Sequence, residues 1–146
     1  MPGQDEMTEA DKLSIPLEKL CFIIDKARQF DAKDVLTDPG DSSNATDDRM
    51  RSVLEDHSDD PVYLELKSAI WALNEDEQID LVALTWLGRG DDTLVNWDEL
   101  RAEAGRDHTN RTADYVLGIP LLSDYLEDAI SQFGLSCADL DEADRE

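Results

Sequence analysis

The stretch NEDEQIDLVALTWLG, residues 74–88, constrains the fold more than any other part of the sequence. Its apolar residues fall on nearly every side of a helix, and a helix that is apolar almost all round belongs in the middle of a bundle. Asn74 and Glu77 have the spacing of a capping box, and the acidic first turn suits the positive end of the helix dipole. We therefore predict a helix from Glu75 to Leu87 near the centre of the fold.

The rest of the chain places apolar residues at helical spacing and shows no useful length of strand-like alternation. Asp60 is predicted to cap a helix that begins at Pro61, and Asn96 with Glu99 gives a second capping-box pattern. Helices are predicted over residues 16–30, 48–57, 61–73, 97–104, 111–117 and 120–133. The fold class is therefore predicted to be all-α: a compact single-domain helical bundle of about five to seven helices with no sheet.

Composition divides the chain into three parts. Residues 1–13 form an acidic tail predicted to be disordered, residues 14–135 the helical domain, and residues 136–146 a second acidic tail. Residues 31–46 are rich in Asp, Ser, Gly and Pro without periodicity, so a mobile loop is predicted there. A length of 146 residues fits one domain.

The sequence GRGD, residues 88–91, allows three interpretations. An adhesion motif requires an extracellular protein, and the acidic N-terminus, which has no apolar segment, does not resemble a secretory signal. A phosphate-holding loop normally leads into a helix, whereas these glycines follow one. We favour the third interpretation, in which Gly88 and Gly90 end the central helix and Arg89 complements the negative end of its dipole.

The chain carries a net charge of −23, which restricts its partners. Nucleic-acid backbones and anionic membrane surfaces attract cations, so we predict no direct nucleic-acid binding and no membrane association. The charge suits a protein partner with a basic surface, or an acidic mimic that occupies the nucleic-acid site of another protein. Adaptation to high salt produces the same bias without any partner, and the charge by itself favours that explanation over a functional surface.

Cys21 and Cys137 lie far apart in the sequence and do not suggest a disulfide framework. Cys21 stands in the apolar segment LCFII, where a small buried side chain is expected. Together with the absence of a secretory signal, these features predict a cytoplasmic location.

Side chains suited to catalysis are sparse. His57 and His108 each lie in an acidic turn, where aspartates could complete a metal site, but neither has the two-histidine spacing of a zinc protease. The sequence contains no nucleophile elbow and no phosphate-binding glycine loop after a strand. We therefore predict no catalytic, cofactor-binding or metal-binding residues, and a metal-assisted hydrolase using either histidine is the alternative.

Several polar and aromatic residues stand out because they lie in or beside apolar helices. Asp80 would need a partner, because an unpaired charge in a core is very costly. Arg111 and Asp114 are three residues apart and could pair on a helix surface. A tryptophan that reaches the surface would be an anchor for a partner. The candidate interaction or structural ion-pair residues are Asp80, Trp86, Arg89, Arg111 and Asp114.

The segments LNEDEQIDLVALTWLGRGD and RTADYVLGIPLLSDYLEDAISQFG resemble a family of small bacterial proteins known as domain of unknown function 3775. The resemblance covers about residues 14–137 and implies a compact helical protein without established activity, cofactor or catalytic residues, so no residue roles carry over. The leading prediction is a non-enzymatic, cytoplasmic interaction or regulatory protein whose partner presents a basic surface. An apolar helix face left over from the bundle would also allow a homodimer.

Overall fold

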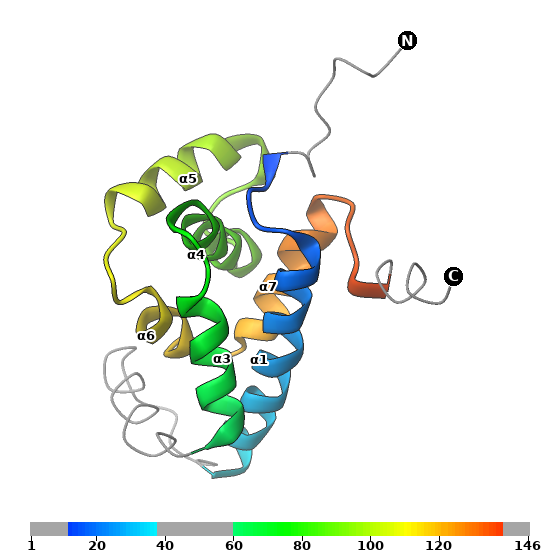
Figure 1. Ribbon diagram of the computed structural model, residues 1–146. Coiled ribbons are helices and arrows are strands. Elements are labelled where there is room, and N and C mark those ends of the chain that lie inside the picture. Colours follow the sequence, from blue (N-terminus) through cyan, green and yellow to red (C-terminus); the bar gives the residue numbers. More distant parts are fainter. Residues whose placement is uncertain (1–11, 38–59, 139–146) are drawn as a thin grey trace.

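The structure, a computed structural model, describes residues 12–37 and 60–138 of the chain. These residues form six α-helices, one short 3-10 helix and no strand, which confirms the predicted all-α fold (Figure 1). The elements are α1 (Leu17–Thr37), α3 (Pro61–Trp71), α4 (Glu75–Arg89), η2 (Leu94–Asn96), α5 (Trp97–Arg106), α6 (Thr112–Leu117) and α7 (Leu122–Gln132).

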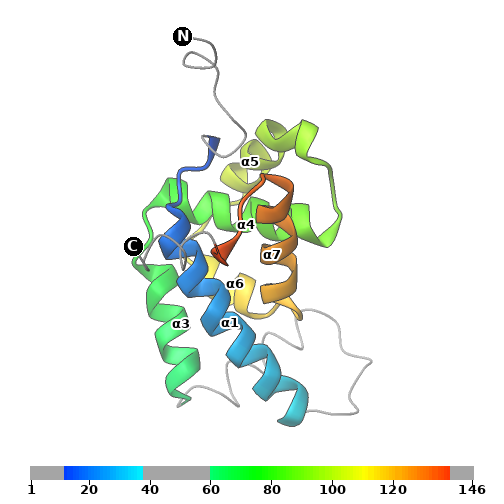
Figure 2. The same cartoon turned by 90° about the vertical axis from the view of Figure 1, so that its right-hand side faces the viewer.

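Helix α4 is the centre of the bundle, as predicted. It contacts α5, α6 and α7, while α1 packs against α3 and α7 (Figures 1 and 2). Every residue from Ile79 to Thr85 is buried, so two consecutive turns of α4 have no solvent-facing side. The predicted capping box is present: the side chain of Asn74 accepts from the backbone N–H of Glu77, and the Glu77 carboxylate accepts from the backbone N–H of Asn74.

The two glycines after the central helix have different roles, and the predicted role of Gly88 is wrong. Gly90 adopts φ 94° and provides the left-handed cap, so α4 ends two residues later than predicted. Gly88 lies inside α4, where a Cβ atom would stand 1.8 Å from the carbonyl oxygen of Tyr125 in α7. Gly88 is therefore needed for the close approach of two helices.

Other predicted boundaries also need correction. Helix α1 continues to Thr37, so the first seven residues of the predicted 31–46 loop are helical, as expected for a segment containing the good helix formers Ala, Lys and Leu. The rest of that loop and the predicted helix over 48–57 lie outside the described residues. Asp60 caps α3 as predicted, whereas Asn96 makes no side-chain cap and instead donates to Asp92.

The cysteines form a disulfide, which contradicts the expectation that they stay unpaired. Cys21 of α1 is bonded to Cys137, with their Cα atoms 5.7 Å apart. The chain turns back after α7 at Gly134, which has φ 79°, and α7 itself packs against α1. The 116-residue separation in sequence therefore says nothing about the distance in space. The cysteines no longer support a reducing compartment, and Cys137 ties the start of the predicted C-terminal tail to the bundle.

Among the described residues, no helix combines the length and the apolar character that crossing a bilayer requires.

Candidate functional site

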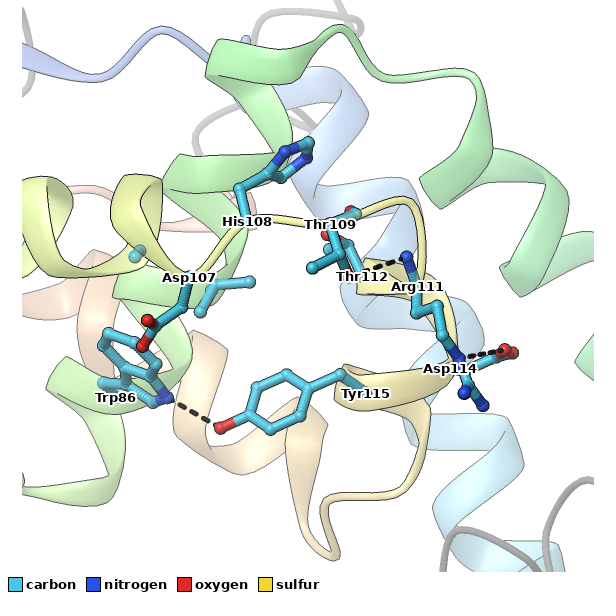
Figure 3. Close-up of a pocket in the computed structure, with 10 residues that line it drawn as sticks. Trp86, Asp107, His108, Thr109, Arg111, Thr112, Asp114 and Tyr115 are labelled. Atoms are coloured by element: carbon cyan, nitrogen blue, oxygen red, sulfur yellow. Dashed lines mark hydrogen bonds and ion pairs between the residues drawn. The ribbon is translucent and has the colours of Figure 1, made fainter.

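A pocket of about 440 Å³ opens between α4, α5 and α6 (Figure 3). Its floor is made by the buried side chains of Val82, Ala104 and Thr112. Its rim comes from the turn between α5 and α6 and from α6 itself. We call it the α4–α6 pocket; its remaining lining residues are Trp86, Asp107, His108, Thr109, Arg111, Asp114 and Tyr115.

An indole and a phenol form one wall of the pocket. The Nε1–H of Trp86 in α4 donates to the hydroxyl oxygen of Tyr115 in α6 at 2.9 Å. Both side chains are half-buried, and Figure 3 shows their polar ends pointing toward each other along one side of the pocket. The hydroxyl oxygen of Tyr115 accepts in this bond and its O–H group can still donate, so this wall offers two aromatic rings and a hydrogen-bond donor.

A carboxylate between two cations forms the opposite side. Arg111 Nε lies 3.8 Å from Asp114 Oδ2, and Lys67 Nζ of α3 lies 3.3 Å from Asp114 Oδ1. The guanidinium of Arg111 is largely exposed, whereas Asp114 is half-buried. Because Asp114 is flanked by two positive charges, the exposed guanidinium can also meet an anion at the rim.

His108 is held by a hydrogen bond that shows which of its ring nitrogens carries the proton. The Nε2 of His108 lies 2.8 Å from the side-chain oxygen of Gln78, whose amide nitrogen donates to the carbonyl of Ile70. The Gln78 oxygen can only accept, so Nε2 carries the proton and donates. The other ring nitrogen, Nδ1, lies 3.9 Å from a carboxylate oxygen of Glu75.

The metal site predicted as an alternative around His108 is not assembled. Figure 3 shows the ring of His108 turned away from both Asp107 and Asp114. Across residues 12–37 and 60–138, no three His, Cys, Asp or Glu side chains are close enough together to hold a metal ion. His57, the other histidine proposed for such a site, lies outside the described residues.

The two hydroxyls beside the pocket hold the turn together. Thr112 Oγ1 donates to the carbonyl of Thr109, and Thr109 Oγ1 accepts from the backbone N–H of Arg111. These bonds orient the start of α6, and among the described residues neither hydroxyl is hydrogen-bonded to a basic side chain. The described pocket therefore offers surfaces for binding, and no nucleophile paired with a base.

Arg89 borders this region from the end of α4. Its guanidinium donates to Asp91, with Nη2 at 2.6 Å from Oδ2. The hydrogen bond to Asp91 chiefly, and the nearby Tyr115 to a smaller extent, raises the pKa of Arg89. Asp91 thus engages the arginine of the GRGD sequence within the chain.

Asp80 lies on another side of α4 and does not contribute to the pocket. It has an exposed fraction of 0% and accepts from Arg101 of α5 and from the backbone N–H groups of Ser14 and Ile15. Burial raises the pKa of Asp80, and the hydrogen bonds from these three residues oppose that rise. Asp80 is therefore a structural anchor that ties α5 and the segment before α1 to the central helix.

Of the five predicted residues, the structure brings Trp86, Arg111 and Asp114 to one pocket, with Arg89 beside it. The sequence analysis missed Tyr115 and Lys67 as their partners. Trp86 and Tyr115 are 29 positions apart, and no local pattern links positions that meet only when α6 folds onto α4. The missed partner of Asp80 is Arg101, 21 positions away on the next helix.

A comparison with known families matches residues 63–135, half of the 146-residue chain, to a family described as protein of unknown function (DUF3775). The matched region begins in α3 and ends just after α7, so it contains every residue that lines the α4–α6 pocket. No curated protein and no solved structure matches the chain significantly.

Proposed function

We propose that this chain, which belongs to the family of proteins of unknown function DUF3775, is a non-enzymatic regulatory protein that binds a small organic ligand in the α4–α6 pocket. The observation that carries the proposal is the pocket itself. Its volume of about 440 Å³ falls in the range of small-molecule sites. It combines a largely apolar floor with polar and charged groups at the rim, and small-molecule sites use such groups to orient the ligand.

The side chains around the pocket support binding rather than catalysis. His108 uses its protonated nitrogen to hold Gln78, and the hydroxyls of Thr109 and Thr112 take part in the turn. The histidine and both threonine hydroxyls of the pocket therefore have structural roles in the folded chain. An enzyme would instead need a nucleophile and a base within hydrogen-bond reach of each other.

The chemistry of the two walls indicates the class of ligand. Trp86 and Tyr115 present aromatic surface and one hydroxyl donor, which suits a planar or aromatic body. Arg111 stands at the opposite rim with an exposed guanidinium, which suits an anionic group on that body. We therefore propose an aromatic organic anion, such as a carboxylate or sulfonate, as the class of ligand.

Two fluorescent probes that differ in charge test this proposal. Anilinonaphthalene sulfonate is an aromatic anion, and N-phenyl-1-naphthylamine has a closely similar ring system without the charge. Each is titrated into the full chain, and the emission of the probe is followed. We expect saturable binding of one molecule per chain, with the anion bound more tightly than the neutral probe.

A matched pair of charge variants then locates the binding. Arg111→Gln should weaken binding of the anionic probe about five-fold, as expected for loss of an exposed ion pair worth about 1 kcal/mol, and should leave the neutral probe unchanged. Arg106→Gln removes the same charge from an exposed position of α5 outside the pocket and should change neither. Non-saturable binding, or equal effects of the two variants, would contradict the proposed site.

A further inference from the structure

A continuous apolar groove runs between α1 and α3 and shares no lining residue with the α4–α6 pocket. One hollow of about 380 Å³ is lined by residues that include Phe22, Ala69 and Leu73. A second hollow of about 440 Å³ shares Phe22 and Ala69 and adds Leu64. Because the two hollows share residues from both helices, they form one channel, which we call the α1–α3 groove.

Two large apolar side chains, Phe22 of α1 and Leu64 of α3, line this groove while exposed to solvent. The exposed fractions are 46% for Phe22 and 48% for Leu64. Leu64 and Ser68 are one turn apart on α3 and both line the second hollow. Exposed aromatic and leucine side chains gathered along one channel are typical of a docking surface.

The charges beside the groove indicate what docks there. Both lysines at the groove already have carboxylate partners: Lys19 lies 3.3 Å from Glu77, and Lys26 lies 3.3 Å from Glu65. Two further acids, Glu18 and Asp25, are exposed on α1 one turn before and after Phe22. An occupant therefore meets apolar anchors flanked by negative charge, in a chain whose net charge is −23.

We propose that the α1–α3 groove binds an amphipathic helix of another protein, with apolar residues on one face and lysine or arginine on its flanks. Helices α1 and α3 run antiparallel and form a groove between them (Figure 1). Because this groove has no strand edge to which an extended peptide could add, a helix lying along α3 is the form of ligand that fits. Helix α3 has 11 residues and is about 16 Å long, enough for anchors at i, i+4 and i+7 of the partner.

Charge also disfavours the other occupants. A second copy of the chain would bring another acidic surface, and two molecules of net charge −23 repel each other. The terminal segments of the chain are poorly suited as well, because residues 1–11 contain no lysine or arginine and residues 139–146 contain a single arginine among several acids. This proposal is independent of ligand binding in the α4–α6 pocket.

A selection experiment tests the partner class directly. A phage-displayed library of helical peptides, unbiased in charge, is selected on the immobilised full chain. The double variant Phe22→Ser with Leu64→Ser removes both exposed apolar side chains of the groove and is the counter-selection target. Val95→Ser, at a position 92% exposed in η2, is the control outside the groove. We expect enriched peptides to carry apolar residues at helical spacing and a basic flank, to bind the Val95 variant normally, and to lose at least ten-fold affinity for the double variant.

An enriched peptide, made synthetically and labelled with fluorescein, then tests the role of charge by fluorescence anisotropy. Glu18→Gln with Asp25→Asn should weaken binding about five-fold at low salt and flatten its salt dependence. The control variant Asp98→Asn with Glu103→Gln removes the same amount of charge from α5 and should leave peptide binding unchanged. Circular dichroism confirms that every variant is folded.

Several outcomes would overturn the proposal: no enrichment, enrichment of neutral or acidic peptides, or equal binding to the double variant. Sedimentation of the chain alone decides about self-association. A dimer that dissociates in the double variant would mean that a second copy occupies the groove.

Discussion

Replacing Gly88 with alanine should destabilise the protein, even though alanine is the better helix former. Gly88 lies in α4, where a Cβ atom would stand 1.8 Å from the carbonyl oxygen, 2.5 Å from the carbonyl carbon and 2.8 Å from the Cα of Tyr125. All three are backbone atoms, so no side-chain rotation removes the clash. Normal contact requires more than 3 Å, so α4 and α7 would have to separate by about 1 to 2 Å at this point.

Two opposing effects set the magnitude. Alanine gains about 1 kcal/mol over glycine in a helix interior. Forcing extra volume into a packed interface costs about 1–3 kcal/mol, and more when the backbone has to move. The contact between α4 and α7 is the most extensive pairing of described helices, so separation also exposes apolar surface from both helices. We expect Gly88→Ala to lower the free energy of unfolding by about 2 kcal/mol or more.

A glycine in another helix supplies the control. Gly105 lies in α5, and a Cβ there would meet only the Cδ1 atom of Ile79 at 3.6 Å, which is an ordinary contact. Gly105→Ala should therefore stabilise the protein by about 0.5–1 kcal/mol. Urea denaturation followed by circular dichroism measures both variants. If Gly88→Ala is as stable as the native chain, the close approach of α4 and α7 is not as described and the reasoning fails.

Three further contacts lead to predictions that the same urea denaturation measures. Arg101→Met leaves the buried carboxylate of Asp80 without its cation and should cost about 3 kcal/mol at pH 7. Burial raises the pKa of Asp80, so the folded state binds its proton more tightly than the unfolded state. The loss of stability caused by Arg101→Met should therefore shrink as the pH falls toward 4, and a loss that stays the same would contradict this reasoning. Asp31→Ala removes the carboxylate that accepts from the N-terminus of α7 and should cost about 1 kcal/mol; a midpoint equal to that of the native chain would refute the cap. Reducing the disulfide between Cys21 and Cys137 opens a long loop and should cost about 2–5 kcal/mol; identical midpoints with and without reductant would count against the bond.

The helices and several of their ends could be predicted because the relevant interactions are local. The capping box of Asn74 and Glu77 spans four residues, and Asp60 caps the helix that starts immediately after it. The burial of α4 follows from apolar residues on nearly every side, whatever the neighbouring helices are. Local patterns failed where two interactions compete, as at Asn96, whose side chain donates to Asp92 and does not cap α5.

The errors concern contacts between distant segments. A glycine that ends a helix and a glycine that allows a neighbouring helix to approach look alike in sequence. Only the position of the Tyr125 backbone in the fold distinguishes the role of Gly88 from that of Gly90. The error about the disulfide has the same cause, because only the folded chain brings Cys137 next to Cys21 of α1. The pocket could be predicted only in part. Trp86 was identified from the sequence, but no local pattern indicated its hydrogen-bond partner Tyr115.

Helix α4 links the stability of the fold to the geometry of the proposed ligand site. Asp80 of α4 binds Arg101 of α5, and Gly88 allows α7 to approach α4 closely. Trp86, two residues before Gly88, lines the pocket. Seven consecutive residues before Trp86 are buried, so the indole projects from a segment with little freedom to move. The opposite rim has a different character, because it is a short turn held by hydrogen bonds between Thr109 and its neighbours. A ligand would therefore contact an indole on a rigid helix and a turn already fixed by hydrogen bonds, and this preorganisation lowers the entropy cost of binding.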